Sequence, residues 1–233
     1  MKYRAYLWSA LAVAAVLGGA ANGALASDLP QQKPIYKAAP AVEVWNPWMI
    51  RLRALGVVTR NSGSVDQVAG SGLTTTDTVV PELDISYFFN QNWAAELILG
   101  VTKHSITGTG AINGLNVGSA WLLPPTLTMQ YHFTDFGAFK PYVGAGVNYT
   151  VFFNQSAGNT PNGGVTITQS HLHNSFAPAA QIGFDYMIDR HWGINLDVKK
   201  LWLRPDWDGN NGALTGKVNL DPWLIGTGIT YKF

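Results

Sequence analysis

The sequence predicts an all-β fold, namely an eight-stranded antiparallel transmembrane β-barrel with short periplasmic turns and long extracellular loops. Three observations predict it: an export signal at the start, apolar residues at every second position over most of the remaining chain, and connections that alternate between short and long. An exported chain without a spanning helix can cross a bilayer only as a closed barrel, because each backbone amide there needs a partner.

The N-terminus predicts a secretory signal peptide over residues 1–26. Lys2 and Arg4 precede an apolar run over 5–21, and Ala24-Leu25-Ala26 has the small-x-small form of a cleavage site. A membrane-anchoring helix is the alternative, which the cleavage motif disfavours. No later stretch approaches the roughly 20 apolar residues that a spanning helix needs.

Residues 27–46 carry three prolines and no periodicity, so they are expected to form an extended periplasmic lead-in before a barrel over 47–233. The composition excludes several classes of function. A net charge of +1 gives no electrostatic reason to expect nucleic-acid binding. The absence of cysteine excludes a disulfide scaffold, a thiolate metal site and a cysteine nucleophile.

Eight segments of the mature chain alternate in hydropathy and are expected to be strands. They are 47–59, 77–89, 92–103, 121–133, 139–153, 174–187, 191–203 and 217–233. Tight turns are expected at 90–92, 134–138 and 188–190. The other connections, 60–76, 104–120, 154–173 and 204–216, are rich in Gly, Asn, Ser and Thr and are expected to be long loops.

The two faces of these segments differ in the way that a bilayer requires. Charged residues fall on one face almost throughout, with Lys200 as the exception, and the other face is aliphatic in the middle and aromatic at the ends. The expected periplasmic girdle is Phe89, Trp93, Phe133, Tyr186, Trp192, Tyr231 and Phe233, and the extracellular girdle is Trp121, Tyr149, Phe153, Phe176 and Trp202. A soluble eight-stranded barrel would turn its apolar side inward and needs no girdles.

Inward-facing charges gather on the first three strands. Arg51 and Arg53 lie on the first, Glu82 and Asp84 on its neighbour, and Glu96 on the third. An ion pathway is one interpretation. A lumen plug of ion pairs is favoured, because an eight-stranded barrel is only just wide enough for its own side chains and unpaired charge in a dry space is costly.

Other candidate chemistry is weak. His171 and His173 in a long loop lack a nearby carboxylate, so no metal site or cofactor is expected. An outer-membrane hydrolase is a further alternative, but neither Ser86 nor Ser175 has a His and an acid partner in the pattern that acyl transfer needs. His104 is assigned no role. The chain is therefore not expected to be an enzyme, and no catalytic residue is assigned.

Two stretches resemble the OmpW family. Residues 122–133 (LLPPTLTMQYHF) with 140–150 (KPYVGAGVNYT) are similar to its signature region, and 221–233 (DPWLIGTGITYKF) to its C-terminus. The resemblance implies an outer-membrane protein of a Gram-negative cell, surrounded by lipid, with a narrow apolar interior for passage of small hydrophobic molecules, as in the family's alkane-uptake branch. It also implies that the barrel-assembly machinery reads the end at Phe233.

The family's apolar constriction would match Ile98 and Phe176. Ile98 faces inward, whereas Phe176 faces outward by residue parity, so either Pro178 shifts the register or the assignment fails there. Leu55 and Phe152 are further candidate lining residues above the plug. The expected function is a channel-like protein for small hydrophobic molecules. The alternative is a structural or receptor barrel whose loops bind partners without transport.

Prolines in the upper halves of the even-numbered strands suggest where the wall is interrupted. They are Pro81, Pro125, Pro178 and Pro222. Proline cannot donate to a strand ladder, and a closed barrel has no edge to accommodate it. One interpretation is that these strands extend above the bilayer into water. The other is a lateral opening through which an apolar solute leaves into the membrane.

Overall fold

The computed structural model describes residues 45–59, 62–159 and 166–233. The predicted signal peptide and nearly all of the predicted lead-in lie outside the described residues. The strands are β1 (Trp48–Val58), β2 (Ser62–Val65), β3 (Ser71–Thr75), β4 (Thr78–Phe88), β5 (Trp93–Gly100), β6 (Thr102–Gly110), β7 (Asn116–Leu123), β8 (Thr126–His132), β9 (Phe139–Ala157), β10 (Ser170–Leu172), β11 (Ser175–Met187), β12 (Trp192–Leu201), β13 (Asp206–Gly209), β14 (Leu214–Asn219) and β15 (Trp223–Lys232). Within these ranges no helix has the length and hydropathy to cross a membrane.

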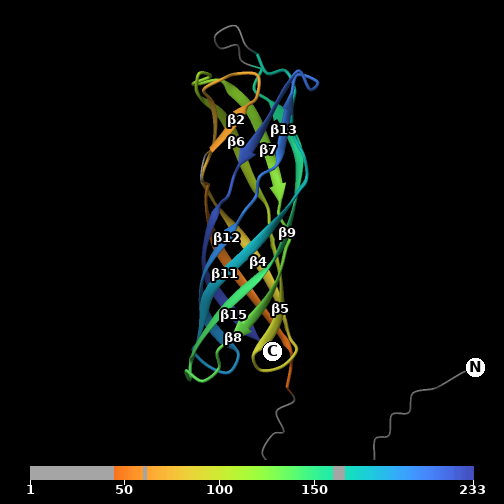
Figure 1. The fold of residues 1–233 in the computed structure, drawn as a ribbon. Coiled ribbons are helices and arrows are strands. Elements are labelled where there is room, and N and C mark those ends of the chain that lie inside the picture. The colour runs from red at the N-terminus through yellow and green to blue at the C-terminus, as the bar shows by residue number, and fades with distance from the viewer. Residues whose placement is uncertain (1–44, 60–61, 160–165) are drawn as a thin grey trace, which may run out of the picture. The chain divides into compact units, whose positions relative to one another are not determined.

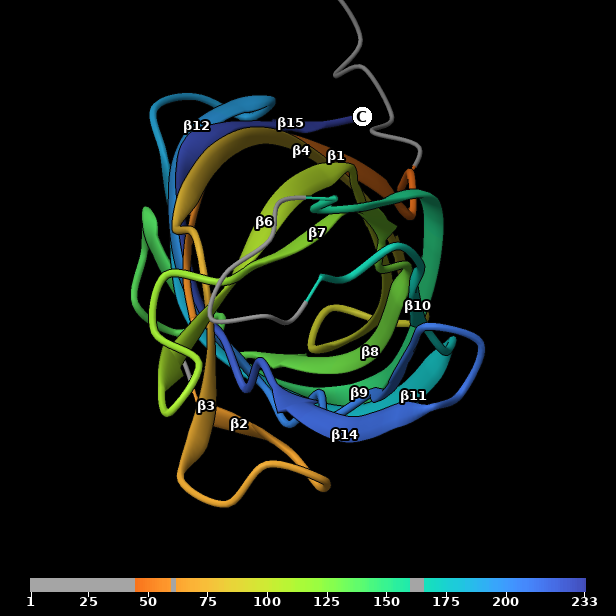
Figure 2. The ribbon, with the colours of Figure 1, turned by 90° about the horizontal axis from the view of Figure 1, so that it is seen from above.

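The lower half is a closed antiparallel barrel. Its strands follow one another in the order β11-β12-β15-β1-β4-β5-β8-β9, and the pairing of β9 with β11 closes the ring (Figure 1, Figure 2). The last strand joins the first, with Leu52 of β1 opposite Ile229 of β15 on one side and Leu83 of β4 on the other. The predicted fold class and the predicted tight turns are confirmed.

The segments predicted to be long loops are largely strands, which corrects the sequence interpretation. β2, β3, β6, β7, β10, β13 and β14 and the end of β9 continue the wall upward. β7, β6 and β3 continue the barrel sheet from β9, and β10-β13-β14-β2 forms a separate four-stranded sheet. The error has a physical cause: the outward positions up here, such as Lys103 and Ser105, carry polar side chains, so the composition looked like that of a loop.

The two halves of the barrel have opposite polarity. Below, side chains such as Leu52 and Ile229 face outward while charged and amide side chains fill the lumen. Above, the interior is an apolar core and the outer face is polar. That core contains Val65, Leu73, Ile106, Leu115, Val117, Ile167, Leu172, Trp207 and Val218. The extracellular half is therefore packed like a soluble protein, while the lower half presents its apolar face to lipid.

The wall is interrupted where the halves meet. Pro124 and Pro125 separate β7 from β8, and Pro222 lies in the gap between β14 and β15. Pro81 and Pro178, in contrast, lie inside continuous strands, opposite Ala54 and Val147. Two of the four predicted prolines therefore mark interruptions, and the other two are tolerated within a ladder.

Candidate functional site

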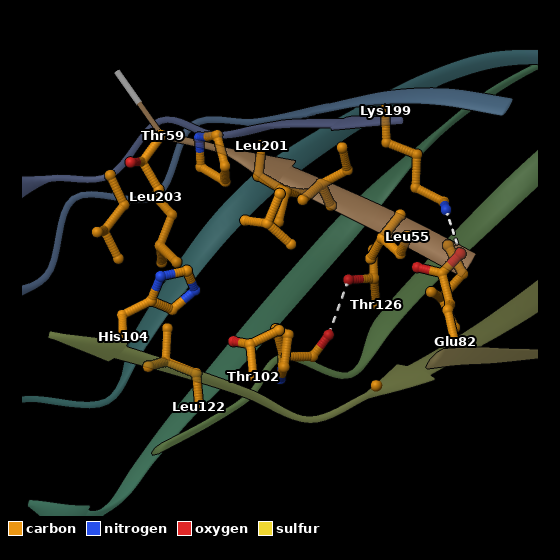
Figure 3. A pocket seen from close by; sticks show the side chains of 17 residues that line it. Leu55, Thr59, Glu82, Thr102, His104, Leu122, Thr126, Lys199, Leu201 and Leu203 are labelled. Atoms are coloured by element: carbon orange, nitrogen blue, oxygen red, sulfur yellow. Dashed lines mark hydrogen bonds and ion pairs between the residues drawn. The ribbon is translucent and has the colours of Figure 1, made fainter. Parts of the chain in front are cut away.

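An apolar pocket lies inside the barrel near the level of the interruptions (Figure 3). It encloses a cavity of about 50 Å³. Leucines, isoleucine, valine and proline make up most of its lining, since inward positions change from polar to apolar at this height. The apolar lining residues are Leu55, Val57, Ile98, Leu122, Pro124, Leu201, Leu203, Leu220, Pro222 and Leu224. A cavity of this size holds little more than a few waters, so a larger solute has to widen it.

A cluster of charged side chains closes the pocket from below. Lys199 and Glu82 form its floor, with Lys199 Nζ 2.6 Å from Glu82 Oε1 and 2.9 Å from Asp197 Oδ1. Both partners of the floor pair are at most 2% exposed at the side chain. Ions so thoroughly removed from water are stable only when each is paired.

Arginines of β1 connect the rest of this charge cluster. Arg51 contacts Glu96, and its Nε and Nη2 donate to Asp185 at 3.0 and 2.6 Å. Tyr142 lies under the Arg51 guanidinium, with its ring centre 4.8 Å away. Ser86 donates to Glu96 at 2.9 Å. Arg51 thus crosses the lumen from the β4–β5 side to β11.

Arg53 lies one step higher and contacts four carboxylates. Its side chain pairs with Asp84, lies 3.4 Å from Glu82 Oε1, 3.6 Å from Glu96 Oε1 and 3.0 Å from Asp197 Oδ1. The structure therefore brings the five residues of the predicted plug together.

Three members of the cluster were not assigned to it from the sequence: Asp185, Asp197 and Lys199. Residue parity already placed all three inward. The missing information was that the lumen is narrow enough for β1 to reach β11 and β12 directly, as the pairs Arg51–Asp185 and Arg53–Asp197 do.

The candidate constriction residues divide into three groups. Leu55 and Ile98 line the pocket. Phe152 lies above it, in the apolar core. Phe176 faces outward, is 75% exposed, and packs on Tyr149 with ring centres 4.5 Å apart. Because Pro178 keeps its register opposite Val147, the assignment of Phe176 to the constriction is wrong.

The surroundings of the pocket differ above it and at its side. Above it, a cavity of about 10 Å³ lies in the apolar core between Ile106, Phe152 and Leu172. At the side, the pairing of the β5–β6 strand with the β7–β8 strand stops at Ile98–Thr126 and resumes at Thr102–Leu122.

We call this gap the side window; it is bounded by 99–101 and 123–125. Gly100 and Pro124, one on each side of it, both line the pocket. On the far side of Pro124 and Pro125, Asn148 seals the wall by donating to both carbonyls at 3.1 and 3.3 Å. The side window is therefore a gap in the strand pairing of the wall, beside the pocket.

A few polar groups interrupt the apolar lining. Thr126 donates to the Pro124 carbonyl at 3.1 Å. His104 of β6 is 4% exposed, and its Nδ1 lies 2.6 Å from the carbonyl oxygen of Thr76. Thr102, two residues before His104, is 5% exposed and on the same face of β6. No sequence pattern assigns a role to either of these residues.

A second, wider hollow lies on the periplasmic side of the charge cluster. Its volume is about 600 Å³, and Met49, Phe88, His132, Lys140 and Lys232 are among its lining residues. The charge cluster separates it from the apolar pocket, since Asp185 lines only the lower hollow and Glu82 only the upper pocket.

The remaining candidate residues lie away from both hollows. His173 Nε2 is 2.6 Å from Asp208 Oδ1 on the extracellular sheet, and His171 packs edge-on against His173. Among the residues that the structure describes, no three His, Asp or Glu side chains are grouped so as to hold a metal ion. Ser86 donates to Glu96, and Ser175 donates to the carbonyl of Phe176.

The chain is similar in sequence and in structure to known outer-membrane proteins. The family model described as OmpW family matches residues 48–233. The outer-membrane protein y4mB of Sinorhizobium fredii is 52% identical over 94% of this chain and 95% of its own. The dibenzothiophene metabolism operon protein PahQ of Pseudomonas aeruginosa is 29% identical over 84% and 93%. The crystal structure of OprG from Pseudomonas aeruginosa superposes with a TM-score of 0.71 at 27% identity, covering 80% of this chain and 95% of that one.

Proposed function

Because the chain belongs to the OmpW family of outer-membrane β-barrels, we propose that it passes small hydrophobic molecules through the apolar pocket and releases them sideways into the membrane. The observation that carries the proposal is the position of the pocket. It is apolar, lies directly on a dry charge cluster, and is bounded at the side by an interruption of the wall.

The charge cluster makes straight passage to the periplasm unfavourable. An apolar solute gains free energy from contact with Leu55 and Ile98, and none from contact with the ion pairs of Arg53 and Lys199 below. Opening the cluster would separate buried ions, which costs several kcal/mol per ion. The path with the lowest free-energy cost for an apolar solute therefore leaves the pocket sideways, above the Glu82–Lys199 floor.

The side window offers that route. No ladder pairing joins 99–101 to 123–125 among the described residues, so widening it breaks few backbone hydrogen bonds. Val101 outside the window is exposed, and the acyl chains of the membrane would receive the solute there. A solute that takes this path stays in apolar surroundings throughout.

The chemistry of a relative supports the same class of solute. PahQ is, by its name, a protein of a dibenzothiophene metabolism operon. Dibenzothiophene is a flat apolar aromatic, and the pocket lining of this chain suits molecules of that kind. A receptor barrel would not take up solute through the pocket. Measuring such uptake therefore distinguishes this proposal from that alternative.

Uptake of a labelled aromatic hydrocarbon by outer-membrane vesicles tests the proposal. Ile98→Trp fills the pocket and is expected to reduce uptake to the level of vesicles without the protein. Phe176→Trp, which places the same tryptophan side chain on the outward face, is the control and is expected to leave uptake unchanged. Gel mobility before and after heating confirms that each variant is folded. Undiminished uptake by folded Ile98→Trp protein would contradict the proposal.

A further inference from the structure

His104 and Thr102 place two hydrogen-bonding groups in a pocket whose lining is mostly apolar above its Glu82–Lys199 floor. Both side chains come from β6 and both line the pocket (Figure 3). Because Thr102 and His104 are two residues apart on the same face of β6, their Cβ atoms lie roughly 7 Å apart. An oxygen atom between them could therefore reach both. Within the described residues, Thr102 Oγ1 makes no hydrogen bond, nor does the Nε2 atom of His104.

The tautomer of His104 follows from its one partner. A backbone carbonyl only accepts, so Nδ1, at 2.6 Å from the Thr76 oxygen, carries a proton. Burial lowers the pKa of His104, against the opposing effects of the Thr76 hydrogen bond and of Asp77. The residue lies on β6, beside the extracellular girdle and above the membrane-spanning strands. Its ring is thus neutral near pH 7, and Nε2 is a bare acceptor.

From this arrangement we infer that, within the proposed function, the pocket selects apolar molecules that carry one hydroxyl group, such as phenols and medium-chain alcohols. The ligand hydroxyl donates to His104 Nε2 and accepts from Thr102 Oγ1, while the rest of the molecule packs against Leu122 and Leu203. A hydroxyl is the smallest group that satisfies an acceptor and a donor together. Hydrocarbons leave both groups without a partner, and ethers leave the imidazole without one.

Discrimination should be moderate. A neutral hydrogen bond contributes a factor of about threefold to tenfold in affinity, and a buried acceptor left without a partner adds to the difference. A difference in affinity of this size can be measured only between two ligands of nearly equal size and hydropathy, one with a hydroxyl group and one without. 4-Fluorophenol and 4-fluoroanisole meet that need, because methylation removes the donor and keeps the oxygen.

Binding of these two ligands to the folded barrel in lipid nanodiscs, measured by fluorine NMR, is the test. His104→Asn keeps an N–H near the position of Nδ1, so it can still bond Thr76, but it removes Nε2. Thr102→Val removes the hydroxyl at constant shape. Ile98→Trp blocks the pocket and shows which part of the signal comes from it. We expect wild-type protein to prefer the phenol by about threefold to tenfold, and His104→Asn to lose that preference.

The outcomes separate this inference from the proposed function. Equal binding of phenol and anisole by wild-type protein, abolished by Ile98→Trp, would overturn the hydroxyl selectivity and leave the proposed function standing. A preference that persists in both His104→Asn and Thr102→Val would overturn the assignment to these residues. Binding of neither ligand, or binding that Ile98→Trp does not change, would overturn both proposals.

Discussion

Removing the Arg53 side chain should destabilise the barrel strongly. Arg53 is 2% exposed and lies within 3.6 Å of carboxylates on three other strands. The charge cluster holds five carboxylates, Glu82, Asp84, Glu96, Asp185 and Asp197, against three cations, Arg51, Arg53 and Lys199. Arg53→Met preserves most of the volume and leaves two cations for the same five acids.

The magnitude follows from burial. Removing one partner of a buried ion pair costs about 3–5 kcal/mol, because the other charge stays buried without compensation. Arg53 has four partners rather than one, which argues for the upper part of that range. With a urea m-value of about 2 kcal/mol per molar, a loss of about 4–5 kcal/mol should lower the unfolding midpoint by roughly 2–2.5 M.

Urea unfolding of the barrel in detergent micelles, followed by tryptophan fluorescence and gel mobility, measures the midpoint. Arg53→Met with Asp84→Asn is the matched control: it removes an acid together with the cation and should recover a large part of the loss. A midpoint that does not move in Arg53→Met would refute the reasoning, because it would mean that water in the lumen screens the ions.

Three further predictions concern other parts of the barrel. Deleting Phe233 should lower the yield of folded, heat-modifiable protein in the membrane while export continues, if the barrel-assembly machinery reads that end; a normal yield would argue against the role. Pro125→Val restores an N–H beside the side window and should slow uptake of apolar solutes, whereas Pro178→Val within continuous β11 should not, and equal effects would count against the window. Hydrogen bonds from the backbone N–H groups of Trp192 and His191 lower the pKa of Asp189, so its contribution to stability is present above the ordinary aspartate pKa and is lost as pH falls through the lowered value. Asp189→Ala should therefore lower the urea midpoint more at pH 7 than at pH 2, and an equal deficit at both would contradict this account.

The sequence predicted the lower barrel well because a bilayer imposes one rule on every strand there. Leu52 and Ile229 had to face outward and Arg53 inward, so parity alone sorted the faces. Residue parity also placed Phe176 outward, as the structure does. The assignment of Phe176 to the constriction, which came from the family resemblance, was wrong. Height above the membrane was not readable in the same way, since Lys103 and Ser105 are as suitable for a solvated strand as for a loop.

Contacts across the lumen were beyond sequence reasoning. Neighbouring strands can be paired by turn length, which brought Arg53 near Glu82 and Asp84. The contacts of Arg51 with Asp185 and of Arg53 with Asp197 depend instead on the stagger of the closed barrel, which decides which levels of opposite strands meet. The surroundings of His104 are likewise invisible in the sequence, because its partner is the backbone carbonyl of Thr76 and no side-chain pattern reveals a carbonyl.

The reversal of polarity between the two halves of the barrel also determines how deeply the protein inserts into the membrane. If the barrel sank by two residues per strand, Lys103 and Ser105 would enter hydrocarbon. If it rose as far, the outward Val58 and Val79 at the upper ends of β1 and β4 would leave hydrocarbon for the extracellular headgroups. Each displaced side chain adds on the order of 1–3 kcal/mol, and all strands of the ring move together. The free energy of the protein in the membrane thus rises steeply when the barrel moves up or down. The barrel alone therefore holds the side window at the height of the outer leaflet.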